Sequence, residues 1–272
     1  MNQNFEGITI REIDELSEMT EVEQLQKEIW GVEDLEVLPG LAMIPIKAVG
    51  GVLLGAFDGA ELVGFSFAFP GYKDGRSFLH SDMLAVKPAY RARRLGFQLK
   101  MAQRAAALQK GIDTITWTFD PLQALNANLN FGKLGVTSDR YIVNFYGETT
   151  SFLHSTGTDR LWVTWQLNSQ HVCERLGVVD EKQLHADCSK VLTIGEDRSP
   201  VRSASDEPQV FLDIPANFNQ LVKEELELAL FWRVASREAF TEALERGLSV
   251  QDFYLIKNGD LSFGRYLLSA SQ

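Results

Sequence analysis

The sequence is poor in cysteine and has fewer basic than acidic residues, and both shortages exclude classes of protein. Only two cysteines, Cys173 and Cys188, occur among 272 residues. They cannot form a disulfide framework and they fit a reducing compartment. Lysine and arginine total 26 against 37 aspartates and glutamates, which gives a formal net charge of −11. Because nucleic-acid surfaces need an excess of basic side chains, we expect no nucleic-acid partner.

Long apolar runs are also missing. No stretch reaches the roughly 18 consecutive apolar residues of a membrane-spanning helix. The polar start MNQNFEG lacks the apolar region of a signal peptide. We therefore expect a cytoplasmic location and no membrane partner. With 45% hydrophobic and 23% charged residues, the composition is that of a globular protein with one large domain or two smaller ones.

Against this acidic background, basic residues gather between a predicted strand and a predicted helix. The strand covers residues 81–86, and the helix after it has apolar residues at helical spacing, namely Phe97, Met101, Ala105 and Leu108. Arg91, Arg93 and Arg94 surround the helix entry, where Gly96 leaves backbone N–H groups uncrowded. A helix N-terminus favours negative charge, so this turn predicts a phosphate site. A solvated basic loop is the alternative interpretation.

This segment resembles the central motif of the GNAT superfamily of acyl-CoA-dependent N-acyltransferases, Arg/Gln-x-x-Gly-x-Gly/Ala after a strand. Arg91 and Gly96 match the motif, and Arg94 stands where its first glycine is usual. The segment WTFDPLQALNANLNFGKLG, residues 117–135, resembles the family's second cofactor-contacting segment. Its matching residues are Asn126, Lys133, Leu134 and Gly135. Phe131 stands where the family usually has a tyrosine.

The resemblance implies a fold class, α/β (α+β), with a mixed, mostly antiparallel central sheet flanked by helices. Periodicity and turn residues give the expected elements in order. They are strand 8–10, helix 16–30, a hairpin of 51–57 and 61–69 around Asp58-Gly59, strand 78–86, helix 96–109, strand 114–119, helix 122–134, and strands 141–146 and 161–167. We predict a GNAT-like acyltransferase domain over residues 1–168.

A small C-terminal α/β unit is predicted after a polar connection. Residues 169–209 are expected to form a linker or extended connection, and residues 210–272 a strand, a helix and a hairpin. The strand is 210–214, Asn217 is expected to cap one long helix up to Gly247, and strands 250–256 and 261–268 flank Asn258-Gly259. Because this core is thin, we expect the unit to dock onto the first domain or to form a homodimer.

The resemblance implies a cosubstrate, acyl-CoA, and residues that bind it. The diphosphate is expected on the backbone N–H groups of Leu95, Gly96 and Phe97, with Arg91, Arg93 and Arg94 adding charge. The pantetheine arm is expected along the strand that carries Met83, Leu84 and Val86, and Asn126 completes the set of cofactor-binding residues. No metal is expected.

Acyl transfer to an amine also needs a base, and polar residues near strand ends are the candidates. His80 and Asp82 are expected on one face of their strand by alternation, either as the base or as a hydrogen-bonded structural pair. Asp120 is a third choice, although Asp120-Pro121 is more typical of a turn or helix cap. Tyr141, with Tyr146 as a second choice, is the candidate acid in place of the missing tyrosine, against the alternative of a packed aromatic ring.

Two further groups of residues have competing interpretations. His171, Cys173, His185 and Cys188 could be written as a zinc site, but their spacing matches no familiar zinc module, and scattered structural residues are favoured. Arg233 and Arg237 lie one helical turn apart, where we favour a solvated helix face over a pair bridged by a carboxylate such as that of Glu238.

The sequence thus predicts an N-acyltransferase. It would transfer an acyl group, acetyl or succinyl, from acyl-CoA to the amine of a small molecule by direct attack in a ternary complex. The segments WTFDPLQ, NANLNF and DRLWVTW resemble a bacterial GNAT subgroup with amino acid N-succinyltransferase members, which makes an amino acid a candidate acceptor. Arg76, Arg140 and Arg160 are candidate partners for a succinyl carboxylate. The alternatives are a GNAT-fold module that binds acyl-CoA without turnover and an unrelated nucleotide-binding α/β protein.

Overall fold

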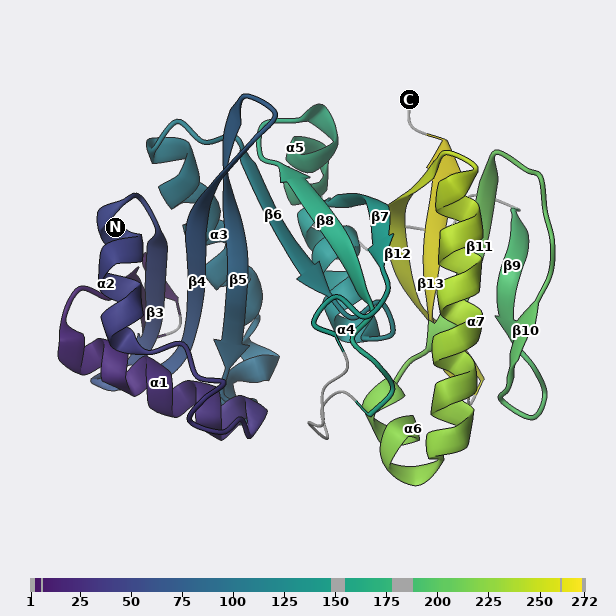
Figure 1. The fold of residues 1–272 in the computed structure, drawn as a ribbon, viewed down its shortest axis with the longest axis horizontal. Coiled ribbons are helices and arrows are strands. Elements are labelled where there is room, and N and C mark those ends of the chain that lie inside the picture. The colour runs from purple at the N-terminus through teal and green to yellow at the C-terminus, as the bar shows by residue number, and fades with distance from the viewer. Residues whose placement is uncertain (1–2, 6, 148–154, 178–187, 260, 271–272) are drawn as a thin grey trace. The chain divides into compact units, whose positions relative to one another are not determined.

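The computed structural model describes residues 3–5, 7–147, 155–177, 188–259 and 261–270. The chain forms two compact units, shown in Figure 1. Unit 1 is Met1–Trp117 with Gln166–Asn168, and unit 2 is Thr118–Trp165 with Ser169–Gln272. The predicted domain boundaries at residues 168 and 209 do not coincide with this division, and the assignment of domains stays a prediction.

Unit 1 is built on a sheet whose strands follow the order β1-β2-β3-β4-β5-β6. The neighbours are antiparallel up to β5, and β5 pairs with β6 in parallel. The bounds are β1 (Gln3–Phe5), β2 (Ile8–Glu12), β3 (Val52–Asp58), β4 (Glu61–Lys73), β5 (Arg76–Val86) and β6 (Thr114–Phe119), of which β6 passes into unit 2 after Trp117. A parallel pair needs a crossover, and the helix between β5 and β6 provides it.

Two tight hairpins give unit 1 its antiparallel part. In the predicted hairpin, Asp58 pairs with Glu61 and Gly59 has a φ of 59°. The second hairpin joins β4 and β5 through Asp74 and Gly75, at φ 51° and 78°. Asp-Gly suits a turn that needs two positive φ values. The sequence prediction overlooked this second turn and therefore began β5 two residues late.

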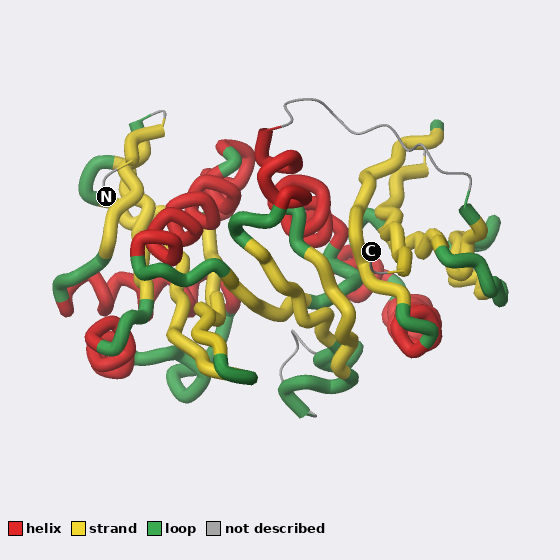
Figure 2. Tube along the Cα trace, turned by 90° about the horizontal axis from the view of Figure 1, so that it is seen from above, coloured by secondary structure: helices red, strands yellow, loops and turns green. Residues whose placement is uncertain are grey.

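Helices cover both faces of this sheet, as Figure 2 shows. On one face, α1 (Leu16–Trp30) and α2 (Gly40–Ala48) bring Met19, Val22, Leu25 and Met43 into a core with Phe65 and Phe67 of β4. The residues of β4 that alternate with those rings face α3 (Leu95–Gln109), since a Cβ added at Gly64 would lie 3.5 Å from Leu99 Cδ1. The sheet of unit 1 is therefore buried on both sides.

The buried side of α3 differs from the predicted one. The expected apolar face of Phe97, Met101, Ala105 and Leu108 is only half-buried. The buried residues are Leu95, Leu99, Lys100, Ala102, Gln103 and Ala107. Two polar residues in this set break the apolar spacing, which is why the periodicity indicated the wrong face.

Unit 2 contains a second group of strands, in the order β8-β7-β12-β13-β11-β9-β10. Their bounds are β7 (Thr137–Ile142), β8 (Arg160–Gln166), β9 (Ser189–Ile194), β10 (Pro200–Arg202), β11 (Gln209–Pro215), β12 (Leu248–Asn258) and β13 (Leu261–Ala270). The pair β9–β11 is parallel and the other neighbours are antiparallel. The predicted class, mixed α/β with a mostly antiparallel sheet, is confirmed.

The helices of unit 2 correct several predicted elements. The predicted helix 122–134 is α4 (Ala124–Ala127) followed by the π-helix η2 (Asn128–Leu134). Asn217 does act as a cap, but of the short α6 (Phe218–Glu224), and the long α7 (Leu226–Glu245) begins after a break at Glu225. The predicted linker 169–209 contains α5 (Gln170–Gly177), β9 and β10. The predicted strand 141–146 overlaps β7 only at residues 141–142.

Aromatic rings centred on Tyr266 form the core of unit 2. The Tyr266 ring lies 4.7 Å from Phe253, 5.1 Å from Phe240 and 5.7 Å from Phe131, measured between centroids. Its side chain is fully buried, and its hydroxyl donates to the Pro121 carbonyl at 2.6 Å. The core therefore joins β13, β12 and α7 to η2. None of the helices in the described part of the chain has the length and apolarity that a membrane crossing needs.

Inside unit 2, an ion pair links β11 to β13. The Arg265 guanidinium donates to both carboxylate oxygens of Asp213, at 2.6 and 2.7 Å, and both side chains are buried. Arg265 also lies near the rings of Phe211 and Phe263. Two hydrogen bonds in a fixed geometry suit a guanidinium and a carboxylate that have both lost water.

We predict that Arg265→Met lowers the free energy of unfolding by about 3–5 kcal/mol, because it leaves the Asp213 carboxylate buried without a partner. Urea titration followed by circular dichroism measures the change. The double variant Asp213→Leu/Arg265→Met should lose less stability than Arg265→Met alone, since no unpaired charge remains. A double variant that is no more stable than the single one would contradict this account.

Candidate functional site

The pairing of β5 with β6 ends early, and this opens one edge of β5. Leu79 pairs with Ile115 and His80 with Thr116, and no later pair joins the two strands among the described residues. Within unit 1, β5 nevertheless continues to Val86 and β6 to Trp117. From Ser81 onward, β5 therefore presents backbone groups on the side away from β4 that no neighbouring strand satisfies.

A β-bulge lies where this open edge begins. The register between β4 and β5 shifts from Phe67 opposite Met83 to Ala68 opposite Ser81, which leaves Asp82 as the extra residue. Bulges bend a strand, increase its twist and occur often beside active sites. The bulge also interrupts the alternation from which we expected His80 and Asp82 to share a face, so that argument does not hold at Asp82.

The basic turn stands at the other end of the open edge. After β5 the chain forms the 3-10 helix η1 (Pro88–Arg93), and α3 begins at Leu95. Arg91, Arg93 and Arg94 are all exposed, and Arg91 Nε donates to the Val86 carbonyl at 3.2 Å. The three arginines thus lie in the residues directly before the start of one helix, and their role in binding a phosphate stays a prediction.

The N-terminus of α3 has backbone donors without side-chain caps. The N-cap residue Arg94 makes no capping hydrogen bond through its side chain. The first described backbone N–H of the helix to bond within it is that of Gln98, which donates to the Arg94 carbonyl at 3.2 Å. The N–H groups of Leu95, Gly96 and Phe97 are therefore available to an anion, which the helix dipole also favours.

Arg94 takes the backbone conformation that its position requires. Its φ is 56° and its ψ is 21°, in the left-handed region that glycine adopts freely. A residue with a side chain pays about 1–2 kcal/mol for this conformation. The chain therefore keeps the shape expected of a glycine at this point of the motif while adding a guanidinium.

The predicted pantetheine-strand residues all lie on β5. Val86 is buried, whereas Met83 and Leu84 are half-buried. Met83 packs against the core beneath α1 and α2. Their backbone, rather than their side chains, forms the open edge.

His80 and Asp82 differ in their surroundings. His80 is buried, and its Nδ1 lies 2.9 Å from Thr116 Oγ1 on β6. Burial, helped by the charge of Lys100, lowers the pKa of His80 to about 4. The Asp82 side chain reaches solvent, although the protein around it still raises the pKa of its carboxyl. His80 is therefore neutral at physiological pH and buried, whereas Asp82 is exposed.

The predicted site residues Asp120, Asn126, Tyr141 and Tyr146 belong to unit 2. Asn126 lies on α4 with an exposed side chain. The Tyr141 hydroxyl donates to Asp159 Oδ2 at 2.7 Å, and the Tyr141 ring stacks on Phe240 at 5.6 Å. Burial and the Asp159 charge raise the pKa of Tyr141 well above its ordinary value. Tyr141 thus has the features of the packed aromatic alternative. Tyr146 is exposed in the turn after β7.

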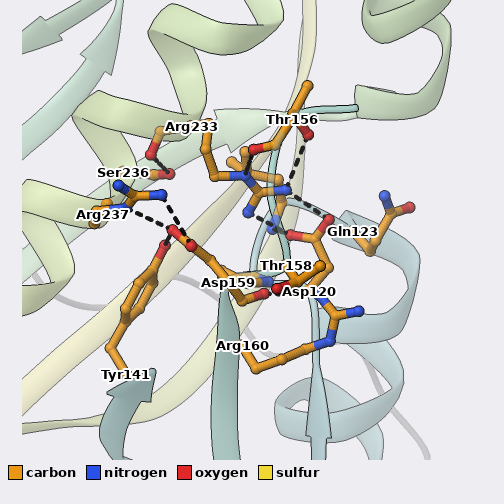
Figure 3. Close-up of polar contacts among 12 residues, drawn as sticks. Asp120, Gln123, Tyr141, Thr156, Thr158, Asp159, Arg160, Arg233, Ser236 and Arg237 are labelled. Atoms are coloured by element: carbon orange, nitrogen blue, oxygen red, sulfur yellow. Dashed lines mark hydrogen bonds and ion pairs between the residues drawn. The ribbon is translucent and has the colours of Figure 1, made fainter. Parts of the chain in front are cut away.

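Tyr141 stands at the edge of a network of charged side chains, drawn in Figure 3, and joins it through Asp159. Arg233 of α7 donates to both oxygens of Asp120, at 2.7 and 2.8 Å, and also to the Thr156 carbonyl. Arg237, one turn later, donates to both oxygens of Asp159, at 2.8 and 3.0 Å. The solvated helix face that we favoured for the two arginines is wrong, because each has a carboxylate partner from a distant part of the chain.

This network removes Asp120 as a base. Burial would raise the pKa of the Asp120 carboxyl, but the Arg233 guanidinium outweighs it and holds the pKa below its usual value. Asp120 Oδ1 also accepts the Leu122 N–H at 3.0 Å, which agrees with the turn interpretation. Sequence reasoning missed the pair with Arg233 because nothing in the local sequence connects residues so far apart.

Two candidates remain, namely the phenylalanine in place of the family's tyrosine and the histidine and cysteine residues of the possible zinc site. Phe131 is fully buried between Phe119 and Tyr266. Within the described residues, Cys173 and Cys188 form no disulfide, and His185 lies outside those residues. In the part of the chain that the structure describes, no three histidine, cysteine, aspartate or glutamate side chains are grouped to hold a metal ion.

Neither the family models nor the curated proteins compared with this chain give a match. Solved structures of acetyltransferases are similar at low identity. An aminoglycoside 6'-acetyltransferase type Ii is 20% identical, with a TM-score of 0.48 over 59% of this chain and 98% of its own. The ribosomal-protein-S18-alanine N-acetyltransferase from Escherichia coli is 14% identical, with a TM-score of 0.47 over 60% and 95%. A GNAT family acetyltransferase from Elizabethkingia anophelis with acetyl-CoA bound is 16% identical, with a TM-score of 0.45 over 60% and 99%.

We predict that Asp159→Asn weakens the pH dependence of stability in acid. Burial alone would raise the pKa of Asp159. The hydrogen bond from Arg237 outweighs burial, so the pKa lies below its ordinary value. The stabilisation is therefore complete above about pH 4 and is lost as the pH falls through the lowered pKa. At pH 7 the variant should be less stable by about 1–3 kcal/mol.

Urea titrations between about pH 2 and 7 measure both effects. The control is Asp139→Asn, which changes an exposed aspartate of β7 and should leave the profile unaltered. An Asp159→Asn profile as steep as that of the unmodified protein would show that Asp159 does not contribute to the acid sensitivity.

Proposed function

We propose that this protein is an acyl-CoA-dependent N-acyltransferase that acylates the amine of a small molecule by direct attack in a ternary complex. The observation that carries the proposal is that the open edge of β5 runs from the Asp82 bulge to the uncapped, arginine-lined N-terminus of α3. An acyl-CoA needs both features, since its diphosphate is anionic and its pantetheine arm is an extended chain with amide groups.

The start of α3 suits the diphosphate of CoA. The uncapped N–H groups of Leu95, Gly96 and Phe97 offer backbone donors, and the exposed arginines add charge around them. Arg94 has the left-handed backbone conformation that a glycine would usually supply at the entry to the helix. This is the fit on which the assignment of the cosubstrate rests.

The edge of β5 suits the pantetheine arm. Residues 83–85 keep backbone groups on a side where β6 no longer pairs with them, whereas the Val86 carbonyl already accepts from Arg91 Nε. An extended amide chain binds such an edge in the way that a peptide adds to a sheet. This arrangement uses Met83, Leu84 and Val86 through their backbones.

We assign the base to Asp82 rather than to His80. The carboxyl of Asp82 reaches solvent at the bulge, and its pKa is raised by burial toward the range where a base is effective. His80 is buried, and the low pKa of its ring makes it a poor proton acceptor. We assign it to holding β5 and β6 together through Thr116.

No tyrosine acid is needed for the departing thiolate. Phe131 has no hydroxyl, and Tyr141 already donates its proton to Asp159. A thiol with a pKa near 8.5, about that of cysteine, leaves adequately as the thiolate and takes its proton from water. The proposal covers acetyl and succinyl as the acyl group. Amino acids are among the candidate amines.

One experiment separates turnover from binding. The protein is mixed with acetyl-CoA or succinyl-CoA and a panel of amino acids and other small amines, and thiol release is followed, while calorimetry measures the binding of CoA. Amine-dependent thiol release supports the enzyme. Tight binding without release supports the module that binds acyl-CoA without turnover, and absence of CoA binding overturns the proposal.

We predict that Gly96→Glu abolishes most CoA binding without unfolding the protein. A carboxylate in the first turn of α3 repels the diphosphate, yet it interacts favourably with the helix dipole, by about 0.3–1 kcal/mol. Calorimetry should show a dissociation constant at least about tenfold higher. Lys110→Ala, an exposed charge removed at the opposite end of α3, is the matched control and should change affinity little. Unchanged affinity in Gly96→Glu would disprove the phosphate site.

We predict that Asp82→Asn lowers turnover by about 100- to 10,000-fold while CoA affinity is retained. Because Asp82 must be ionised to accept a proton, activity in the unmodified protein should fall as the pH drops through its raised pKa. That acidic limb should vanish in Asp82→Asn and persist in His80→Gln. A limb that disappears with His80→Gln instead would reverse the assignment.

A further inference from the structure

Lys100 of α3 carries a buried ammonium group whose partners in the described part of the chain are neutral. Its side chain is 2% exposed, and Nζ donates to Ser81 Oγ at 2.7 Å. Nζ also lies 3.6 Å from the centroid of the Trp117 ring. Among the described residues no carboxylate comes within ion-pair distance of it. Such a position is costly for a lysine, and burial lowers the pKa of Lys100 to about 7.

The two partners of Lys100 occupy one particular place in the sheet. His80 and Thr116 form the last pair between β5 and β6. Ser81 and Trp117 are the next residue on each strand, and Lys100 contacts both. Ser81 also comes directly before the bulged Asp82. The ammonium group therefore holds the two strands at the point where they separate.

We infer that Lys100 is a positioning residue, which fixes the point where β5 and β6 part and thereby places the open edge of β5 and the Asp82 bulge. The inference rests on the proposed function, because it is the acyl-CoA that would use this edge. It assigns the lysine no contact with substrate.

Stability alone does not explain a lysine at this place. The neighbouring buried residues of α3 include Leu95, Leu99 and Ala102, so an apolar side chain would suit this face. The titratable group that registers the Lys100 charge is His80, whose pKa it helps to lower. When a residue lowers stability and is kept for function, its replacement should make the protein more stable and less active.

The same helix face provides a matched control. Gln103 is fully buried one turn after Lys100, and among the described residues neither its amide nitrogen nor its amide oxygen has a hydrogen-bond partner. Leucine is similar in size to glutamine, so Gln103→Leu removes a buried polar group from α3 and leaves Ser81 and Trp117 unchanged. Gln103→Leu should therefore raise the melting temperature and leave CoA affinity unchanged.

The test compares Lys100→Met with Gln103→Leu. We expect both variants to melt at or above the temperature of the unmodified protein at about pH 6, where Lys100 is charged. Only Lys100→Met should bind CoA more weakly, by about tenfold, since a hydrogen bond and a cation–π contact are lost. Amide hydrogen exchange at Ser81–Met83 and Ile115–Trp117 should be faster in Lys100→Met alone.

The pH profile separates positioning from simple packing. In the unmodified protein CoA affinity should fall as the pH rises through about 7, because neutral Lys100 loses its attraction to the Trp117 ring. Lys100→Met should lack this step, and the titration of CoA itself is common to both profiles. Ser81→Ala, which removes the acceptor, should also weaken binding and serves if Lys100→Met does not fold.

The outcomes distinguish this inference from the proposed function. If Lys100→Met binds CoA as tightly as the unmodified protein and exchanges its β5 and β6 amides no faster, the inference is overturned and the proposed function stands. If the unmodified protein binds no CoA, the proposed function fails. In that case, faster amide exchange in Lys100→Met that is confined to β5 and β6 would still show that Lys100 fixes the point where the strands separate. Unchanged exchange would overturn the positioning role of Lys100 as well.

Discussion

The early end of the pairing between β5 and β6 is the constraint on which the candidate site depends. A parallel pair that continued to Val86 would satisfy the backbone of β5 on both sides and leave nothing for a ligand to bind. The extra residue at Asp82 bends β5 just after the last pair. The helix that crosses between the two strands starts beside the far end of the open edge. In unit 1 the bulge, the free strand edge and the helix N-terminus thus follow one another along the chain.

The basic turn depends on the same geometry. Arg91 is fixed to the end of β5 through the Val86 carbonyl, and Arg94 enters α3 in the left-handed conformation. The left-handed backbone at Arg94 is strained, and strain of this kind persists where the surrounding structure over-determines it, often at functional sites. The cost at Arg94 is therefore consistent with a role that glycine alone would not fill, since glycine would give the shape without the charge.

Much of the fold could be predicted because the signals were local. The apolar spacing of α1 and the β-branched run of β6 gave both elements with their observed bounds. The signal for the basic turn was also local, since strand, arginines and glycine follow one another in the chain. The face of α3 was missed because Lys100 and Gln103 are buried, contrary to the usual behaviour of their residue types. The pairs of Asp120 with Arg233 and of Asp159 with Arg237 could not be found, because only the folded chain brings those residues together.

The buried charges of this protein fall into two classes, and the difference between them bears on function. Arg233 and Arg265 each meet a carboxylate through two hydrogen bonds, so their charges are balanced within unit 2 and stabilise the contacts of α7 and β13. Among the residues that the structure describes, the partners of Lys100 are a hydroxyl and an aromatic ring. A paired charge can be explained by the fold that it holds together, whereas a charge with neutral partners lowers stability. Lys100 contacts Ser81 of β5 and Trp117 of β6 just where the two strands separate, which is the place where the proposed function would offset such a cost.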